Sequence, residues 1–308
     1  MVAHVVRAMR PHQWVKNLFV LAPLVFAKQA LVLGHFMGAA LAFAVFSVLS
    51  GCVYILNDIV DVENDRLHPS KRHRPIAAGR LPIAAARTAL AILLIGSAVA
   101  SFAFLPMSFA ALGLSYFALN VAYSFALKHV PFVDVACIAT GFLIRIIAGA
   151  FAINVPITVW ILICTFWLAL FLALGKRKHE ILQAGHKKSE QRRVLARYRL
   201  AHVRVTMLAC AALTAVSYVS FTILGEETGF KPSQLVWTIP CVLFGLFRFH
   251  QLTERVGDGR SPTDLMLSDK PFIANLVLWS AIVVAVLYAH CWPSGRSWGS
   301  GRAPPTGV

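Results

Sequence analysis

Residues 36–79 read FMGAALAFAVFSVLSGCVYILNDIVDVENDRLHPSKRHRPIAAG, and this stretch joins the two features that organise the whole chain. Its first part, residues 36–56, is apolar and uncharged over about the length that a helix needs to cross a bilayer. Its second part begins at Asn57 and holds acidic residues followed by a run of basic ones. We therefore predict a membrane-spanning helix whose polar end carries a functional site.

The composition places the rest of the chain in the membrane as well. Of 308 residues, 58% are hydrophobic and 14% are charged, with a mean hydropathy of +0.70, whereas soluble domains carry about 25% charged residues. The 29 Lys and Arg against 13 Asp and Glu give a formal charge of +16. In a lipid-embedded chain this excess indicates membrane orientation and anionic substrates, so we predict no nucleic-acid partner.

Nine apolar segments are long enough to be membrane-spanning helices. They are residues 14–33, 36–56, 83–104, 107–127, 132–153, 157–175, 203–224, 234–250 and 271–289. The predicted fold class is therefore all-α, a polytopic membrane protein with nine helices in one bundle surrounded by membrane lipids. We expect residues 1–290 to form a single integral membrane domain, and residues 291–308, rich in Gly, Ser and Pro, to form a disordered tail.

The basic residues predict the orientation of the bundle. Most Lys and Arg fall in the long polar segments 57–82, 176–202 and 251–270 and in the N-terminal segment, whereas the connections between them are short and almost uncharged. The positive-inside rule then places the N-terminus and the functional site in the cytoplasm. With an odd number of helices in the inner (plasma) membrane, the C-terminus lies outside.

An acidic group follows residues 36–56. Asp58, Asp61 and Asp65 are spaced i, i+3 and i+7, and Asn57 stands four residues before Asp61, so a helix that continued past the membrane would carry all four on one stripe. Oxygen ligands without His or Cys suit Mg²⁺, which shares its coordination shell with substrate phosphates. With the downstream basic residues, this predicts a diphosphate clamp. The alternative is an interfacial loop whose acids and bases merely pair with one another. The basic residues are His68, Lys71, Arg72 and Arg74.

The sequence NDIVDVENDRLHPSKRHRPIAAG resembles the first aspartate-rich motif and the basic segment that follows it in the UbiA prenyltransferase superfamily, whose members are nine-helix membrane enzymes. The sequence YSFALK, with Tyr123 and Lys128, resembles a second element of that family. The resemblance implies that Asp58, Asp61 and Asp65 are catalytic and hold Mg²⁺ together with Asn57.

The chain departs from the superfamily at the end of the sixth apolar segment. Ordinary members carry a second aspartate-rich motif there, but this chain reads LALGKRKHEIL, with Lys176, Arg177 and Lys178 in place of the acids and only Glu180 negative. Cations in this place favour direct binding of a phosphate group. For Lys178 alone, a positive-inside anchor for the helix is the alternative.

The chain combines one acidic motif, the basic segment HPSKRHRPIAAG, a GKRxxE segment and the N-terminal RPHQWVKN. This combination resembles the decaprenyl-phosphate phosphoribosyltransferase branch of the superfamily. The resemblance implies two substrates, phosphoribosyl pyrophosphate held through Mg²⁺ and a polyprenyl phosphate as acceptor. We assign Lys71, Arg72 and Arg74 to the donor phosphates, and Lys176 and Arg177 to one of the two phosphate sites without choosing between them. Candidates for the lipid phosphate are Arg10, Gln13, Trp14, Lys16 and Asn17, although an interfacial position is an equal interpretation for Trp14.

One further cation stands inside a predicted helix. Arg145 lies near the middle of segment 132–153, where a charge must face the bundle interior, so it either binds a substrate anion or pairs internally. Asp134 on the same segment is too far along a regular helix to be its direct partner.

Two other functions stay open at this point. A conventional prenyltransferase would transfer a prenyl chain from its diphosphate to an aromatic acceptor, and loss of the second acidic motif argues against it. A transporter of lipid-linked or anionic cargo would be expected to show inverted repeats with broken helices, which the sequence does not show.

Overall fold

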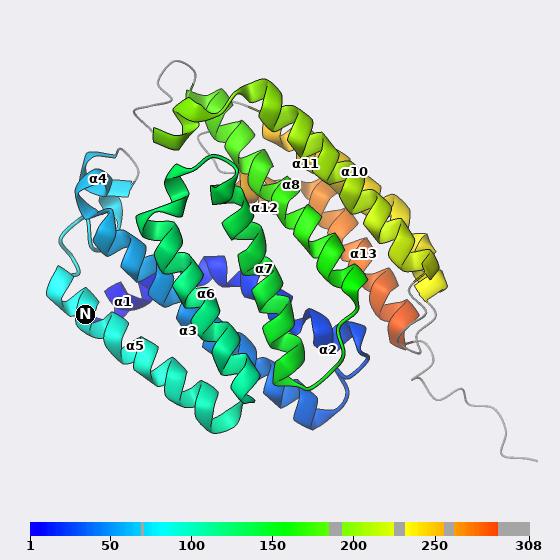
Figure 1. The fold of residues 1–308 in the computed structure, drawn as a ribbon, viewed down its shortest axis with the longest axis horizontal. Helices are drawn as coiled ribbons and strands as arrows, with labels where there is room; N and C mark the ends of the chain where they lie inside the picture. The colour runs from blue at the N-terminus through cyan, green and yellow to red at the C-terminus, as the bar shows by residue number, and fades with distance from the viewer. Residues whose placement is uncertain (69–70, 185–192, 225–231, 256–261, 289–308) are drawn as a thin grey trace, which may run out of the picture.

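A computed structural model describes residues 1–68, 71–184, 193–224, 232–255 and 262–288, and over these residues the chain is helical without strands (Figure 1). The helices are α1 (Val2–Met9), α2 (Ala22–Phe26), α3 (Leu33–Val60), α4 (Val62–Leu67), α5 (Ile83–Phe104), α6 (Met107–Phe125), α7 (Val133–Ala152), α8 (Val159–Ala184), α10 (Leu200–Leu224), α11 (Ile239–Glu254), α12 (Pro262–Ser268) and α13 (Lys270–Tyr288). Short 3₁₀ segments are η1 (Pro11–Leu21), η2 (Lys71–His73), η3 (Leu127–His129), η5 (Arg193–Arg197) and η7 (Pro232–Thr238).

Eight helical spans among the described residues are long and apolar enough to cross a membrane. They match eight of the nine predicted segments, because uninterrupted apolar runs bury their backbone hydrogen bonds within a helix. The all-α prediction is confirmed. The predicted tail, residues 291–308, lies outside the described residues.

The first predicted helix, 14–33, is wrong as a single α-helix. The chain forms η1 and then the short helix α2, which has Pro23 in its first turn. Proline lacks an N–H and clashes with the preceding turn, so a continuous α-helix is interrupted there. Pro23 was the signal in the sequence.

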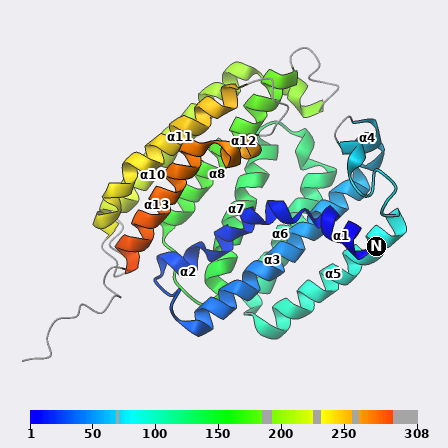
Figure 2. The same cartoon turned by 180° about the vertical axis from the view of Figure 1, so that it is seen from behind.

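This broken segment nevertheless runs through the depth of the bundle, packed against α3 and α7 (Figure 2). Arg10 contacts Asp58 near the end of α3, whereas Leu24 packs with Ala39 near its start. These contacts are separated by about 28 Å along α3 at 1.5 Å per residue, close to the thickness of a bilayer core. The segment is therefore a ninth traverse of the bundle but not a ninth α-helix, and the number of membrane crossings stays a prediction.

The close approach of this segment to α7 depends on a glycine. A Cβ atom built on Gly149 would lie 2.0 Å from the carbonyl oxygen of Val20, so no larger residue fits there. Around this contact Phe46, Phe109 and Tyr116 form a buried aromatic cluster, with the rings of Phe46 and Phe109 5.7 Å apart and edge to face. The core thus holds the N-terminal segment beside α3, α6 and α7.

The polar segments gather at one end of the bundle. In Figure 1 the α4 and η2 region and the end of α8 lie toward the upper left, and the α5–α6 and α7–α8 connections lie toward the bottom. Helix α8 continues to Ala184, beyond the predicted boundary at 175, so the basic residues 176–178 lie on a helix and not in a loop. This end is called the polar end below.

Candidate active site

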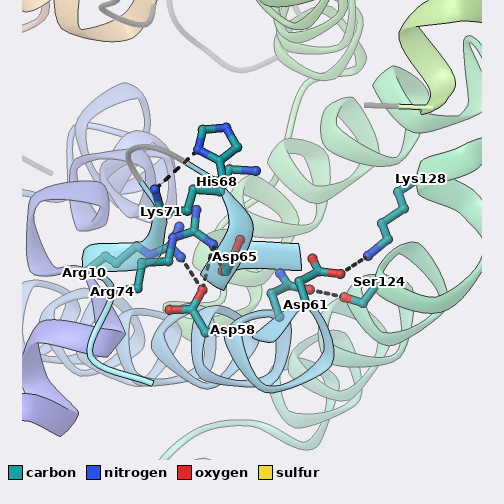
Figure 3. A network of polar contacts seen from close by, with 10 residues as sticks. Arg10, Asp58, Asp61, Asp65, His68, Lys71, Arg74, Ser124 and Lys128 are labelled. Carbon is teal, nitrogen blue, oxygen red and sulfur yellow. Dashed lines mark hydrogen bonds and ion pairs between the residues drawn. The ribbon is translucent and has the colours of Figure 1, made fainter. Parts of the chain in front are cut away.

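Three carboxylates come together where α3 gives way to α4 at the polar end (Figure 3). Helix α3 ends at Val60, Asp61 occupies the break, and Asp65 lies on α4. The predicted single stripe on one continuous helix is therefore wrong, because the chain turns at Asp61. The turn brings Asp58 and Asp65 toward a shared cation and directs Asp61 elsewhere.

Two arginines pair with the buried carboxylates. Arg74 Nη1 lies 3.1 Å from Asp58 Oδ1 and 2.6 Å from Asp65 Oδ2, and Arg10 forms an ion pair with the same oxygen of Asp58. Arg10 has a left-handed backbone with φ 54°, which turns the chain between α1 and η1. Its guanidinium also lies 4.8 Å from the ring centre of Tyr54. The segment 1–10 thus delivers a cation to α3.

The third carboxylate connects α3 to α6 and η3. Lys128 Nζ lies 2.8 Å from Asp61 Oδ1, and the hydroxyl of Ser124 donates to Asn57 Oδ1. Figure 3 shows Asp61 and Lys128 on the side away from Arg10. The predicted residues Asn57, Asp61 and Lys128 therefore lie together, although Lys128 was predicted only from its resemblance to a family element.

The residues of this group fit a hard cation. The described residues contain no His, Cys, Asp and Glu cluster arranged to hold a metal, because each carboxylate turns toward a basic side chain. The donors available are nevertheless all oxygens, as Mg²⁺ requires. Moreover, Asp58 Oδ2 is buried and has no hydrogen-bond partner in the part of the chain that the structure describes, and a buried carboxylate oxygen is stabilised by a cation. Asp58, Asp61, Asp65 and Asn57 are the residues that could hold the ion.

The downstream basic residues divide into two groups. Arg74 is part of the carboxylate network, whereas Lys71 and Arg72 lie in η2 and the side chain of Arg72 contacts His73. Burial, together with the nearby Lys71 ammonium group, lowers the pKa of His68 below its usual value near 6.5. His68 therefore takes up a proton less readily than a free histidine and contributes less positive charge to the predicted clamp.

The end of α8 holds a second, closed polar network. Arg177 Nε lies 2.7 Å from Asp134 Oδ2 and its Nη1 pairs with Glu180, while the hydroxyl of Tyr198 donates to Asp134 Oδ1 at 2.5 Å. That hydrogen bond and burial raise the pKa of Tyr198, with burial the larger cause. Tyr123 on α6 is close enough to interact electrostatically with Arg177. Both predicted residues, Arg177 and Glu180, are thus held by other protein groups.

The two lysines beside Arg177 differ sharply. Lys178 is fully buried, with Nζ 2.7 Å from Glu254 Oε1 and 3.1 Å from Thr253 Oγ1, so it joins α8 to α11. The alternative predicted for Lys178 was a positive-inside anchor of the helix, and this buried position does not fit it. Lys176 is exposed and interacts electrostatically with Lys16 of η1.

Arg145 pairs internally, but with neutral groups. Its three nitrogens donate to Asn17 Oδ1 at 2.8 Å, Tyr116 Oη at 2.8 Å and the carbonyl of Gly141 at 2.9 Å. Asn17 in turn donates to the hydroxyls of Ser47 and Ser50. Arg145 and Asn17, both predicted as substrate contacts, are therefore direct partners in the bundle interior.

The two remaining N-terminal candidates lie on η1 between Arg10 and Lys16. The backbone N–H of Gln13 donates to the carbonyl of Arg10 at 2.9 Å, and Trp14 packs near Met9 and Ile55 with its Nε1 buried and unpaired among the described residues. Trp14 therefore faces protein and not an interfacial belt.

Sequence reasoning missed several residues of these networks, among them Tyr116, Ser124, Asp134 as the partner of Arg177, and Tyr198. Tyr116 and Ser124 are eight residues apart on α6, which is a rotation of about 80° beyond two full turns, so their spacing indicates no shared helix face. Asp134 and Tyr198 are 64 residues apart, and no local pattern connects them.

Comparisons with known proteins agree with this architecture. Residues 17–268 match the UbiA prenyltransferase family. The chain is 33% identical over 288 residues to the decaprenyl-phosphate phosphoribosyltransferase of Corynebacterium glutamicum, covering 92% of this chain and 86% of that protein. It is 37% identical over 222 residues to the protein of the same name from Mycolicibacterium smegmatis, covering 71% and 70%.

Among solved structures, a UbiA homologue from Archaeoglobus fulgidus bound to GPP and Mg²⁺ superposes with a TM-score of 0.69 at 17% identity, covering 93% of this chain and 98% of that one. At this identity the likeness concerns the fold alone. Because the family match spans most of the sequence and two relatives exceed 30% identity over more than two thirds of it, this chain belongs to the UbiA prenyltransferase family.

Proposed function

We propose that this transferase moves 5-phosphoribose from phosphoribosyl pyrophosphate to a polyprenyl phosphate of the decaprenyl type and releases pyrophosphate. The observation that carries the proposal is the division of charge at the polar end. Carboxylates gather at the end of α3 (Figure 3), whereas the end of α8 carries Lys176, Arg177 and Lys178 where a second acidic motif would stand, and of these three only Lys176 is exposed. The names of the relatives from Corynebacterium and Mycolicibacterium support the same reaction.

The carboxylates and their arginines make a donor site suited to a diphosphate. When a diphosphate enters, Arg10 and Arg74 are placed to exchange part of their contact with Asp58 for contact with phosphate oxygens, because their side chains keep 22% and 26% of their surface exposed. Guanidinium groups bind phosphate through paired N–H donors. We assign Lys71, Arg72 and Lys128 to the same donor group.

The reaction needs no general base. A phosphate monoester is anionic at neutral pH, so an oxygen of the acceptor phosphate attacks the anomeric carbon of the ribose while the bond from that carbon to pyrophosphate breaks. Charge builds on the departing pyrophosphate in the transition state, and positioned cations stabilise it. Direct displacement inverts the anomeric centre.

The metal belongs to this proposal as well. Bound by Asp58, Asp61, Asp65 and Asn57, Mg²⁺ would supply charge stabilisation for the leaving pyrophosphate. The protein residues around it hold the donor in place and keep the acceptor phosphate next to the anomeric carbon. We also propose that the polar end faces the cytoplasm, since phosphoribosyl pyrophosphate is a soluble anion.

The test is transfer of radiolabel from phosphoribosyl pyrophosphate into the organic phase, with purified protein, Mg²⁺ and a polyprenyl phosphate. We expect lipid-soluble label only with Mg²⁺ present and Asp61 intact, and Asp61→Asn should lower the rate by about 10²–10³-fold. Glu63→Gln is the matched control, since Glu63 is exposed and its one ion pair among the described residues is with Arg66. Absence of transfer, together with reaction of a prenyl diphosphate and an aromatic acceptor, would identify a conventional prenyltransferase instead.

A further inference from the structure

A second group of cations lies close enough to Arg10 to interact with it electrostatically. At its base is Arg145, which is 8% exposed and has no carboxylate among the described residues within ion-pair distance. Its hydrogen bonds to Asn17, Tyr116 and a backbone carbonyl satisfy its N–H groups but leave its charge without a counter-ion. A buried cation in a membrane protein is stabilised by an anion, so this site lacks a charged partner.

Two lysines add to that charge. Lys16, half-buried on η1, has no carboxylate among the described residues within ion-pair distance and interacts electrostatically with Arg10, Arg145 and Lys176. One acidic group, Asp264 on α12, acts on it in the opposite direction. Three cations, Lys16, Arg145 and Lys176, therefore converge from η1, α7 and α8 near the one carboxylate of Asp264, which is a net positive charge suited to a dianion. Arg10 also acts on Lys16, but it is paired with Asp58.

We propose that Lys16, Lys176 and Arg145 form the subsite that binds the acceptor's phosphate monoester, and that this subsite works without a metal ion. The inference rests on the proposed function, since it names where the acceptor of that reaction binds. Lys16 and Lys176 are the groups that contact the phosphate oxygens, and Arg145 supplies charge from behind. Arg177 and Lys178 are outside the subsite because Asp134, Glu180 and Glu254 already neutralise them.

Arg10 connects the two phosphate sites. Its guanidinium pairs with Asp58 of the donor site, lies over the ring of Tyr54 and acts on the charge of Lys16. Arg145 lies over the ring of Tyr116, 4.6 Å from its centre. Arg10 thus borders both the metal-dependent diphosphate site and the metal-free monoester site. Direct transfer of the ribose from one phosphate group to the other requires these two sites to be close together.

The surroundings favour a lipid phosphate over a free one. A cavity of about 280 Å³ is lined by Ile146, the neighbour of Arg145 on α7, and by Phe26, Ile161 and Phe221. Between this cavity and the polar end, Phe19, Phe142 and Leu172 surround a smaller apolar space. Both spaces lie between η1 or α2, α7 and α8, so an apolar chain attached to the phosphate would have apolar surfaces to follow toward the opposite end.

The experiment measures binding of farnesyl phosphate, farnesol and inorganic phosphate to the detergent-solubilised full chain in EDTA. We expect farnesyl phosphate to bind without metal, and Lys16→Gln and Lys176→Gln each to weaken that binding by about tenfold or more, the size of a lost charge-assisted contact. Lys270→Gln is the control, because Lys270 is exposed at the start of α13 and outside both sites. Asp61→Asn should leave this metal-free binding unchanged.

Each other result overturns the inference. Equal binding of farnesol and farnesyl phosphate would mean that no phosphate subsite exists, and equal binding to both lysine variants would mean that it lies elsewhere. Inorganic phosphate binding as tightly as farnesyl phosphate would identify a site for a free anion. The transfer assay separates the two proposals. Binding that depends on the lysines, without any ribosyl transfer, would retain the subsite and reject the proposed function. Ribosyl transfer by a protein whose binding does not depend on the lysines would retain the proposed function and reject the subsite.

Discussion

The ends of α3 and α8 lie at the same end of the bundle and both carry ion pairs, but they are built in opposite ways. At α3 the buried partner is a carboxylate, and its cations Arg10 and Arg74 keep 22% and 26% of their side-chain surface exposed. At α8 the cations are buried, with Arg177 at 1% and Lys178 at 0%, and Asp134, the partner of Arg177, is buried as well. An exposed partner can exchange for a ligand, whereas a buried one cannot leave without exposing an unpaired charge. The first network is therefore suited to binding and the second to holding helices together.

The largest effect should come from breaking the closed network. Asp134→Asn removes the charge that Arg177 and Tyr198 share, so we expect a loss of about 3–5 kcal/mol in the free energy of unfolding. Thermal melting in detergent measures it, with Glu63→Gln as the neutral reference. Unchanged melting together with lost transfer would place Asp134 in the catalytic machinery and abolish the contrast between the two ends.

Removing a carboxylate from the open network should act on the reaction instead. Asp58→Asn should lower the rate of transfer by about 10²–10³-fold, because Asp58 Oδ2 is buried and has no hydrogen-bond partner among the described residues. The melting temperature should fall less than in Asp134→Asn. Single-turnover rates and melting on the same preparation give both values, and a larger loss of stability than in Asp134→Asn would reverse the comparison.

The pair between α8 and α11 offers a finer test. Glu254→Gln leaves the buried ammonium of Lys178 without its counter-ion, whereas Lys178→Met removes the buried charge and leaves a carboxylate that is 41% exposed. We therefore expect Glu254→Gln to destabilise the protein by about 2–3 kcal/mol more than Lys178→Met. Chemical denaturation of the two variants side by side decides it, and equal stability would mean that Lys178 is not held in a closed pair.

The smallest effect concerns Asp269, which directly precedes α13. It pairs with Arg248 at 2.7 Å and accepts from the N–H of Phe272 at 3.0 Å, and the hydrogen bond from Arg248 lowers the pKa of its carboxyl. Its contribution of about 1 kcal/mol is thus present above the unfolded pKa near 3.9 and lost as pH falls through the lower folded pKa.

Asp269→Asn should therefore be less stable than the parent at pH 7, and the difference should shrink as the pH falls below about 3.9 and through the lower folded pKa of Asp269. Melting curves of the two proteins across that range measure the difference. A gap that persists at the low end of the range would show that Asp269 acts through packing and not through its charge.

Local patterns in the sequence determined the fold class, the eight long helices and the grouping of Asn57, Asp58, Asp61 and Asp65. These features depend on runs of neighbouring residues, because burial of an apolar backbone in lipid leaves a helix as the stable form. Local patterns did not predict the helix breaks at Pro23 and Asp61. One proline or one change of backbone angle ends a helix that hydrophobicity alone would continue.

Only the tertiary structure decided which charges face which partners. Residues 176–178 are three consecutive cations, yet the 100° rotation per residue of α8 turns Arg177 toward Asp134, Lys178 toward Glu254 and leaves Lys176 exposed. Their roles differ because the partners come from α7 and α11, at sequence distances of 43 and about 75 residues. Composition states how many charges a membrane protein carries, but burial beside a distant carboxylate determines which of them remain available to a ligand.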